Sequence, residues 1–172
     1  ILVSGSDDNA MKVWDIITRQ CLSSVIAHPH GVSCVAVHTS KPLIASSGFI
    51  HVPKLWQLSP DNRKVTLVNE VWSKDHHHPS VNSVVFHPTE PFIATTGSDG
   101  NAMLWLQLPQ NRIRLLGTMV TGNTGNNNID VNSVAFHPTA PVLVTGGNGR
   151  ENNLKLWQIN FDSRSTDQPV GN

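Results

Sequence analysis

The sequence predicts an all-β protein that is assembled from repeated groups of short antiparallel strands. The stretch at residues 81–105, VNSVVFHPTEPFIATTGSDGNAMLW, recurs at residues 131–157 and, in a more diverged form, at residues 32–56; a truncated copy opens the chain at residues 2–14. Self-similarity at a period of roughly 40–50 residues is typical of repeat architectures. Within each copy, short apolar runs end at Gly, Pro, Asn or Asp, which is typical of antiparallel strands.

The individual strands follow from these runs in chain order. After a short apolar strand at the N-terminus, residues 5–9 (GSDDN) favour a tight turn because they tolerate left-handed backbone geometry. Along residues 10–16 the side chains then alternate between two faces, as they do in a strand. The same succession of strand, polar turn and strand returns in each later copy. It predicts fourteen strands, at residues 1–4, 10–16, 21–26, 32–37, 43–46, 52–57, 65–72, 81–86, 92–95, 102–107, 112–120, 131–136, 142–145 and 153–159.

Composition restricts the classes of function. Twelve basic residues balance twelve acidic ones, so the chain has no basic field that would hold nucleic acid or an anionic membrane. The two cysteines, Cys21 and Cys34, are expected to be free thiols in a reducing compartment rather than a disulfide. No apolar stretch approaches the ~20 residues of a membrane span, and no signal peptide is visible in this stretch. We therefore expect an intracellular location, cytoplasmic or nuclear.

Two motifs of the repeat point to a known family. Four tryptophans, Trp14, Trp56, Trp105 and Trp157, stand in register with three copies of a turn that begins with His (HTSKP, HPTEP and HPTAP). Over residues 1–160 these motifs resemble the WD-repeat family of β-propellers. With the strands of a blade named a to d from the centre outward, the chain then reads b-c, followed by d-a-b-c three times. The repeats span approximately residues 1–16 (partial), 17–58, 59–108 and 109–160, and residues 161–172 are expected to be a polar tail or linker.

The resemblance implies an incomplete arc of about 3.5 four-stranded blades, because fourteen strands do not close a ring. We expect a fragment of a seven- or eight-bladed ring, since seven blades at this period need roughly 300 residues or more. Two copies of the chain would supply enough strands for seven blades. However, each copy begins with a b-c half blade, and neither copy has an orphan d-a pair to complete it.

The resemblance also implies a buried hydrogen-bonded network in each repeat. Its members are a His before strand a, a Ser or Thr on strand b, an Asp in the b–c turn and the Trp of strand c. A buried indole N–H and a buried hydroxyl need fixed partners, and the carboxylate orients the imidazole. The expected network residues are Ser4, Asp8, Trp14, His28, Ser46, Trp56, His77, Thr95, Asp99, Trp105, Thr145 and Trp157.

Only the third copy, with His77, matches this pattern at every position. The His of the first copy would precede residue 1. The second copy has Ile50 in place of the Asp, and the fourth has Asn127 in place of the His and Glu151 at the Asp offset. These departures affect the geometry expected for individual blades.

By resemblance, the function expected is that of a non-catalytic protein–protein interaction platform, a scaffold or adaptor. Partners, or the remaining blades of the same propeller, would be bound through the face that the d–a loops share with the b–c turns. Two alternatives stay open, namely a structural component of a large assembly and a non-catalytic part of an enzyme whose active site lies elsewhere. Trp72, on an outer strand, is either ordinary packing or a partner contact. The candidate contact residues in the loops are Asp7, Asn9, Phe49, His51, Asn101, Asn127 and Arg150.

Catalysis, metal binding and cofactors are not expected. The run His76-His77-His78 invites a metal site, but a transition metal needs three or four convergent ligands, and no His-rich pair has matching carboxylate or cysteine spacing. The Ser, His and Asp of each motif are assigned to the structural network by the resemblance. A nucleophilic triad would also need an exposed hydroxyl and an oxyanion site.

Overall fold

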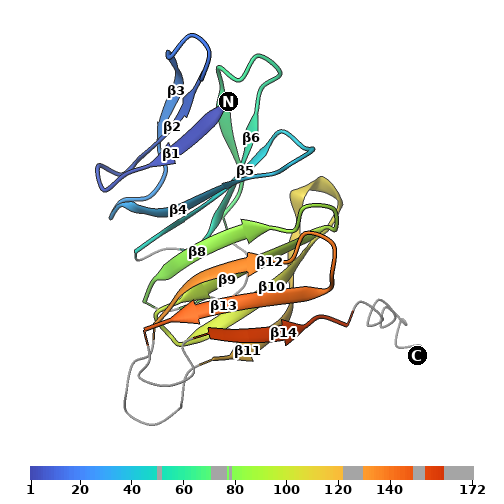
Figure 1. Cartoon of the computed structure of the whole chain (residues 1–172). Helices are drawn as coiled ribbons and strands as arrows, with labels where there is room; N and C mark the ends of the chain where they lie inside the picture. The colour runs from blue at the N-terminus through green and yellow to red at the C-terminus, as the bar shows by residue number, and fades with distance from the viewer. Residues whose placement is uncertain (50–51, 71–76, 78, 122–129, 149–153, 161–172) are drawn as a thin grey trace, which may run out of the picture.

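The computed structural model describes residues 1–49, 52–70, 77, 79–121, 130–148 and 154–160. Across these residues it contains fourteen strands in four antiparallel sheets, so the predicted all-β fold is confirmed (Figure 1). In the same residues, no helix is long and apolar enough to cross a membrane. We call the sheets blades 1 to 4.

Blade 1 consists of β1 (Leu2–Gly5), β2 (Ala10–Trp14) and β3 (Cys21–Ile26), and blade 2 of β4 (Val32–Val37), β5 (Leu43–Gly48), β6 (Lys54–Leu58) and β7 (Val65–Asn69). Blade 3 consists of β8 (Val81–Phe86), β9 (Phe92–Gly97), β10 (Asn101–Gln107) and β11 (Ile113–Val120), with the 3-10 helix η1 (Pro109–Asn111) between the last two. Blade 4 consists of β12 (Val131–Phe136), β13 (Val142–Gly147) and β14 (Leu154–Gln158).

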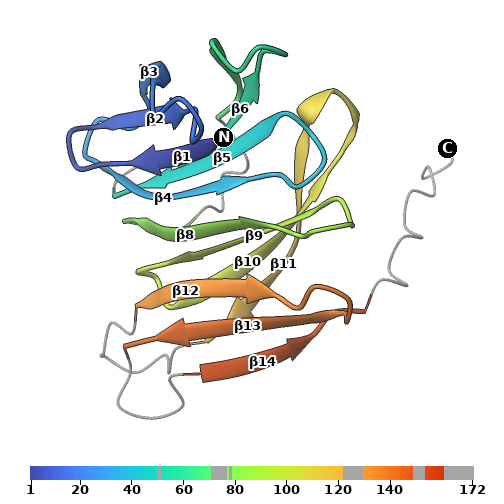
Figure 2. The same cartoon turned by 45° about the horizontal axis from the view of Figure 1, so that its top comes forward.

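The blades follow one another along an open arc, with β4, β8 and β12 side by side as the inner strands of blades 2 to 4 (Figures 1 and 2). The outer strand of each blade leads along the chain into the inner strand of the next, as from β7 to β8. In the described part of the chain, blade 1 has no strand a and blade 4 has no strand d. The strand order is therefore the one that the sequence predicts.

Three apolar cores lie between consecutive blades. At each junction, the face of the later blade that carries the strand-c tryptophan packs on the opposite face of the earlier blade. Between blades 2 and 3, for example, Trp105 and Ile93 of blade 3 pack on Leu55 and Ala45 of blade 2, and none of the four side chains is exposed. Burial of apolar surface between blades is the main source of their stability.

A β-bulge recurs at the start of the inner strand in blades 2, 3 and 4. The extra residues are Ser33, Asn82 and Asn132. A bulge changes the direction in which a side chain points, and two of these side chains reach the neighbouring blade. The Ser33 hydroxyl donates to the carbonyl oxygen of Val81 at 2.6 Å, and Asn82 Nδ2 donates to that of Val131 at 3.1 Å. The bulges thus join successive inner strands.

Some strand boundaries differ from the prediction. Strand β2 ends at Trp14 instead of residue 16, because the Asp15 carboxylate accepts hydrogen bonds from the backbone N–H groups of Ile17 (2.8 Å) and Thr18 (3.2 Å) and so forms a turn. Strand β6 begins at Lys54 instead of residue 52, since Pro53 has no N–H to donate to the sheet. Residues 71 and 72, which were predicted to end the strand at residues 65–72, lie outside the described residues. The predicted tail at residues 161–172 also lies outside them.

Candidate functional site

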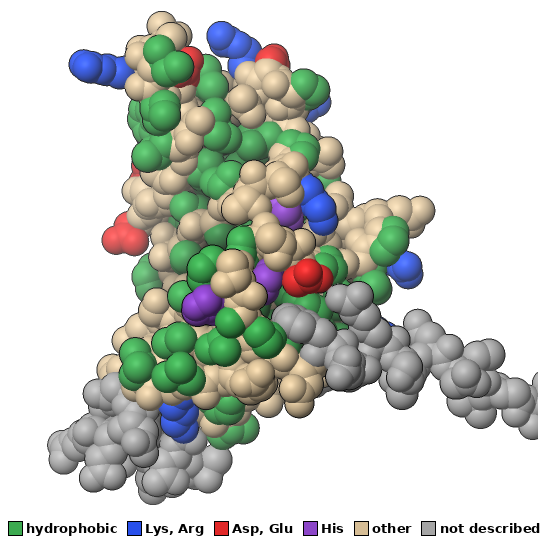
Figure 3. Space-filling view, turned by 45° about the vertical axis from the view of Figure 1, so that its right-hand side comes forward, with side chains coloured by type: hydrophobic (Ala, Val, Ile, Leu, Met, Phe, Trp, Pro, Cys, Tyr) green, Lys and Arg blue, Asp and Glu red, His purple; other side chains and the backbone are tan. Residues whose placement is uncertain are grey.

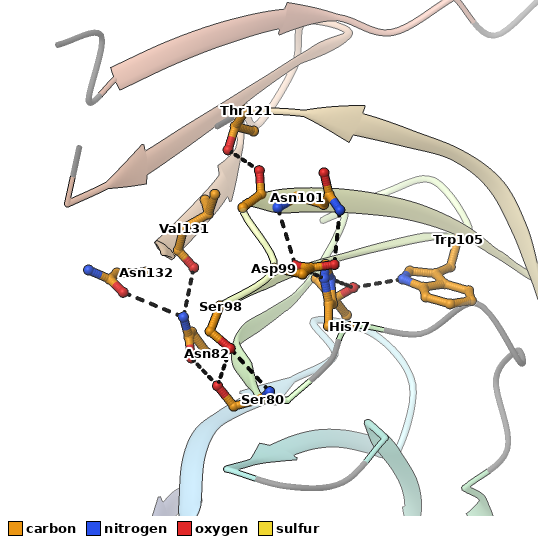
Figure 4. Close-up of polar contacts among 12 residues, drawn as sticks. His77, Ser80, Asn82, Ser98, Asp99, Asn101, Trp105, Thr121, Val131 and Asn132 are labelled. Atoms are coloured by element: carbon orange, nitrogen blue, oxygen red, sulfur yellow. Dashed lines mark hydrogen bonds and ion pairs between the residues drawn. The ribbon is translucent and has the colours of Figure 1, made fainter. Parts of the chain in front are cut away.

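Blade 3 contains a continuous chain of hydrogen bonds between four side chains (Figure 4). His77 Nδ1 lies 2.7 Å from Asp99 Oδ1, and His77 Nε2 lies 2.9 Å from Thr95 Oγ1. The Trp105 indole N–H donates to the same hydroxyl oxygen at 2.8 Å. If Nδ1 carries the ring proton, the hydroxyl of Thr95 donates to Nε2, and each polar group has a partner. The network connects the d–a loop, strand β9, the b–c turn and strand β10.

Asp99 is held in its charged form by this arrangement. Burial of the carboxyl group acts to raise its pKa. Hydrogen bonds from the His77 ring, the His77 charge when present, and the side chain and backbone N–H of Asn101 outweigh burial, so the pKa of Asp99 lies below its ordinary value.

The other blades contain parts of the same network. In blade 2, His28 Nε2 and the Trp56 indole N–H each lie 2.8 Å from the Ser46 hydroxyl oxygen. In blades 1 and 4 the indole–hydroxyl pair is present, as Trp14 with Ser4 at 2.9 Å and Trp157 with Thr145 at 3.0 Å. Ile50, Asn127 and Glu151, where the sequence departs from the pattern, lie outside the described residues.

Asp8 in blade 1 occupies the network position of Asp99 and makes the same turn hydrogen bond that Asp99 makes with Asn101 N. Its carboxylate accepts from the backbone N–H of Ala10 at 3.0 Å, within its own turn. That bond and the Ser6 hydroxyl lower the pKa of Asp8, which is exposed.

Glycines that the sequence analysis did not single out are essential to the network geometry. A β-carbon on Gly97 would lie 2.6 Å from Cβ and Cγ of His77, and one on Gly48 would lie 2.7 Å from Cγ of His28. The imidazole therefore packs directly on a backbone position where no side chain fits. The sequence contains a signal for this role. A glycine stands two positions after the Ser or Thr of strand b in the second, third and fourth copies, as Gly48, Gly97 and Gly147.

The d–a loops and b–c turns lie together at one end of the blades. Hydrogen bonds join them, since Thr121 N and the Thr121 hydroxyl both donate to the carbonyl oxygen of Gly100, and Ala27 N donates to that of Asn9. We call this end the loop face.

The candidate contact residues on the loop face fall into three groups. Asn9 and Asn101 have roles within the fold, because Asn9 Oδ1 accepts from Gly31 N at 2.8 Å and Asn101 Nδ2 donates to Asp99 Oδ2 at 3.0 Å. Asp7 and Phe49 are exposed, with 47% of Phe49 accessible. His51, Asn127, Arg150 and the outer-strand candidate Trp72 lie outside the described residues.

One pair of positions on the loop face changes its chemistry from blade to blade. The pair consists of the residue before strand a and the residue after the strand-b glycine. In blade 3 it is Ser80 and Ser98, whose hydroxyl oxygens are 2.9 Å apart (Figure 4).

The equivalent pair in blade 4 is Asp130 and Asn148. The backbone N–H of Asp130 donates a hydrogen bond to Asn148 Oδ1 at 2.9 Å. In blade 2 it is Gly31 and Phe49, and a β-carbon on Gly31 would lie 3.2 Å from the Phe49 ring. Equivalent backbone positions thus present a hydroxyl pair, an acid–amide pair and an aromatic ring.

The opposite end of the blades carries the turn histidines (Figure 3). In each of the three a–b turns, the His Nδ1 accepts hydrogen bonds from the two backbone N–H groups two and three residues later. The ring of His38 packs at a tilt against Phe86 of the next blade, with ring centroids 5.1 Å apart, and the ring of His87 lies edge-on to Phe136 with centroids 4.9 Å apart.

Burial lowers the pKa of both His38 and His87. The Lys41 charge adds to the effect at His38, and the Glu90 charge opposes it at His87. Among the described residues, no group of three or more His, Cys, Asp or Glu side chains is placed to hold a metal ion. His76 and His78 lie outside them.

The fold and the repeated network define an open arc of WD-type propeller blades. The family described as "WD domain, G-beta repeat" matches the chain at residues 19–49, 69–105 and 115–158, and the chain belongs to this WD-repeat family. WD-repeat proteins are generally non-catalytic scaffolds for protein interactions.

Similar proteins include coatomer subunit beta'-1 of Arabidopsis thaliana, 44% identical over 41 residues, which are 24% of this chain and 4% of that protein. NACHT domain- and WD repeat-containing protein 1 of Mus musculus is 35% identical over 69 residues, which are 40% of this chain and 4% of that protein. DDB1- and CUL4-associated factor 6 of Homo sapiens is 34% identical over 62 residues, which are 36% of this chain and 7% of that protein. The chain therefore aligns with only a small part of each of these relatives.

Proposed function

We propose that this chain is part of a non-catalytic protein-interaction platform and that it contacts its partners through the loop face. The observation that carries the proposal is the variable pair of positions described above. Residues of the blade cores repeat from copy to copy, whereas Gly31–Phe49, Ser80–Ser98 and Asp130–Asn148 differ in size, polarity and charge. Gly31 and Ser80 are buried, so the second residue of each pair, Phe49, Ser98 or Asn148, supplies the exposed variation. A surface that keeps its backbone geometry and changes such side chains is suited to recognising an asymmetric protein partner.

The hydrogen-bonded networks support this proposal as structural elements that hold the loop face rigid. Thr95 and Ser46 have no exposed surface, and both hydroxyls are already bonded to an indole and an imidazole. A catalytic nucleophile needs a hydroxyl that a substrate can reach. The same Asp-His-Thr arrangement that resembles a catalytic triad in composition is therefore assigned to the scaffold.

The experiment compares two substitutions in blade 2 by affinity capture from the native source. Phe49→Ser removes the exposed ring from the loop face, and Val37→Ser removes a similarly exposed apolar side chain at the opposite end of the blade, where 42% of Val37 is accessible. We expect Phe49→Ser to lose captured proteins that Val37→Ser retains, with both variants melting like the parent chain. Equal capture by both variants would place the partner surface elsewhere.

A further inference from the structure

At two of the three blade junctions, the outer strand of the later blade closes the outer end of the core. In blade 3, β11 lies antiparallel to β10 with Leu115 opposite Trp105 and Ile113 opposite Gln107, and both apolar side chains pack against the core between blades 2 and 3. In blade 2, Val65 of β7 packs in the same way against the core between blades 1 and 2.

At the third junction, between blades 3 and 4, the outer end of the core is a groove of about 490 Å³. Its walls include Leu104 and Leu106 of β10, Leu116 and Met119 of β11, and Ile159, which follows β14. The groove continues the core between blades 3 and 4, since Leu104, Met119 and Ile159 also belong to that core. It is therefore the place that the outer strand of blade 4 would fill.

The edge of β14 beside this groove can accept a strand. In the described part of the chain β14 pairs with β13 alone, so the backbone N–H and C=O groups of its other edge have no strand to bond with. An unpaired edge of this kind is a template for a further strand.

The residues that follow β14 in this sequence do not match that position. The residue opposite the tryptophan comes ten positions after it in blade 3 (Leu115) and eleven in blade 2 (Leu67). Ten and eleven positions after Trp157 the sequence has Asp167 and Gln168, followed by a proline that cannot donate to a sheet. The second inward position, filled by Ile113 in blade 3 and Val65 in blade 2, corresponds to Ser165 or Thr166.

We propose that the groove and the free edge of β14 bind an extended segment of another protein as an added strand. The segment runs antiparallel to β14 and places apolar side chains at two alternate positions, opposite Trp157 and Ile159, in the groove. The residue between them points away from the groove and can be polar. Main-chain hydrogen bonds to β14 supply affinity, and the two apolar side chains supply specificity, as in other cases of strand addition. This surface is separate from the loop face.

The probe for the test is a labelled synthetic peptide with the sequence of residues 112–120, RIRLLGTMV, which fills the equivalent position in blade 3. The control peptide carries serine in place of its Ile113 and Leu115. We expect the 172-residue chain to bind the probe peptide. Its affinity for the control peptide should be lower by roughly tenfold or more, because two buried apolar side chains are lost. Backbone amides of β14 should gain protection from hydrogen exchange when the probe binds.

Two variants of the chain test the location. Leu116→Arg puts a charge on the groove wall at a side chain that is already 39% exposed, so folding should survive, and it should weaken probe binding roughly tenfold or more. Leu156→Arg, at a 69% exposed position on β14 that does not line the groove, should leave binding unchanged.

The proposal is overturned if the two peptides bind alike, if Leu156→Arg weakens binding as much as Leu116→Arg, or if β14 gains no protection. It is also overturned if sedimentation shows that the chain alone associates and protects β14, because a second copy would then be the occupant. Phe49→Ser should leave probe binding intact, so failure of the loop-face proposal and failure of this one are distinguishable.

Discussion

The imidazole Nδ1 of His77 lies 2.7 Å from Oδ1 of Asp99, and this contact joins the loop before β8 to the turn between β9 and β10. Because the other ring nitrogen reaches Thr95, a single side chain spans three segments of blade 3. The loop face of this blade is therefore anchored from inside the sheet, and substitutions in the anchor should lower stability without touching the surface.

Trp105→Ala should destabilise the chain by about 3–5 kcal/mol, as substitutions of large buried aromatic residues by alanine do. Trp105 has no exposed surface, and its loss would open a cavity between blades 2 and 3 and leave Thr95 with one partner fewer. Urea unfolding followed by circular dichroism measures the effect. Trp14→Ala is the matched control, because Trp14 is partly exposed at the start of the arc, and its effect should be clearly smaller.

His77→Ala should lower the free energy of unfolding by about 1–3 kcal/mol, because it leaves buried polar groups without partners. A double-mutant cycle with Asp99→Asn tests whether the two residues act together, and their coupling energy should be about 0.5–3 kcal/mol. Additive effects of the two substitutions would contradict the network as drawn.

The low pKa of Asp99 predicts a loss of stability in acid. The unfolded chain takes up the proton first as the pH falls, so the contribution of Asp99 is fully present above the ordinary value of 3.8 and is lost as the pH falls through the lower folded pKa. Asp99→Asn should reduce the slope of unfolding free energy against pH in that window. An unchanged slope would count against the charged form of Asp99 in the folded state.

Gly97→Ala should destabilise blade 3 by about 1–3 kcal/mol, the usual cost of an overpacked site. The added β-carbon would lie 2.6 Å from His77 and from the carbonyl oxygen of Ser80. Gly117→Ala is the control, because a β-carbon on Gly117 meets no atom within 4 Å. The melting temperature of Gly97→Ala should be lower than that of Gly117→Ala. Equal melting temperatures would be inconsistent with the close packing of the imidazole.

The buried turn histidines predict a second loss of stability at mildly acid pH. The pKa of His38 and His87 in the folded chain lies below the ordinary value of 6.5, first because burial disfavours the charged ring. Their contribution to stability is thus complete above 6.5 and is lost as the pH falls from 6.5 through the folded pKa. Melting temperatures between pH 8 and pH 5 should fall toward the acid end, and a flat profile would argue against neutral rings that accept two backbone N–H groups.

Much of the fold could be predicted because its signals are local and repeated. The Trp and His positions set the strand count and the strand order, and turn residues closed each strand. The role of Gly97 was missed because it depends on the packing of a ring that is distant in sequence. The bulge residues Ser33 and Asn82 were missed because their partners lie on the next blade. For Asn9, whose side chain bonds Gly31, the sequence pattern does not distinguish a surface contact from a fold contact.

The bulges of blades 2 and 3 each contact the inner strand of the next blade, and each of the three cores lies between two consecutive blades. These contacts connect a blade to its immediate neighbours. Cooperativity in such an arrangement is one-dimensional, and stability is approximately a sum of blade terms and nearest-neighbour terms. Blades 2 and 3 have two neighbours within this stretch, whereas blades 1 and 4 have one. In the isolated stretch, unfolding should therefore begin at its two ends, and hydrogen exchange should be slowest in β5 and β9.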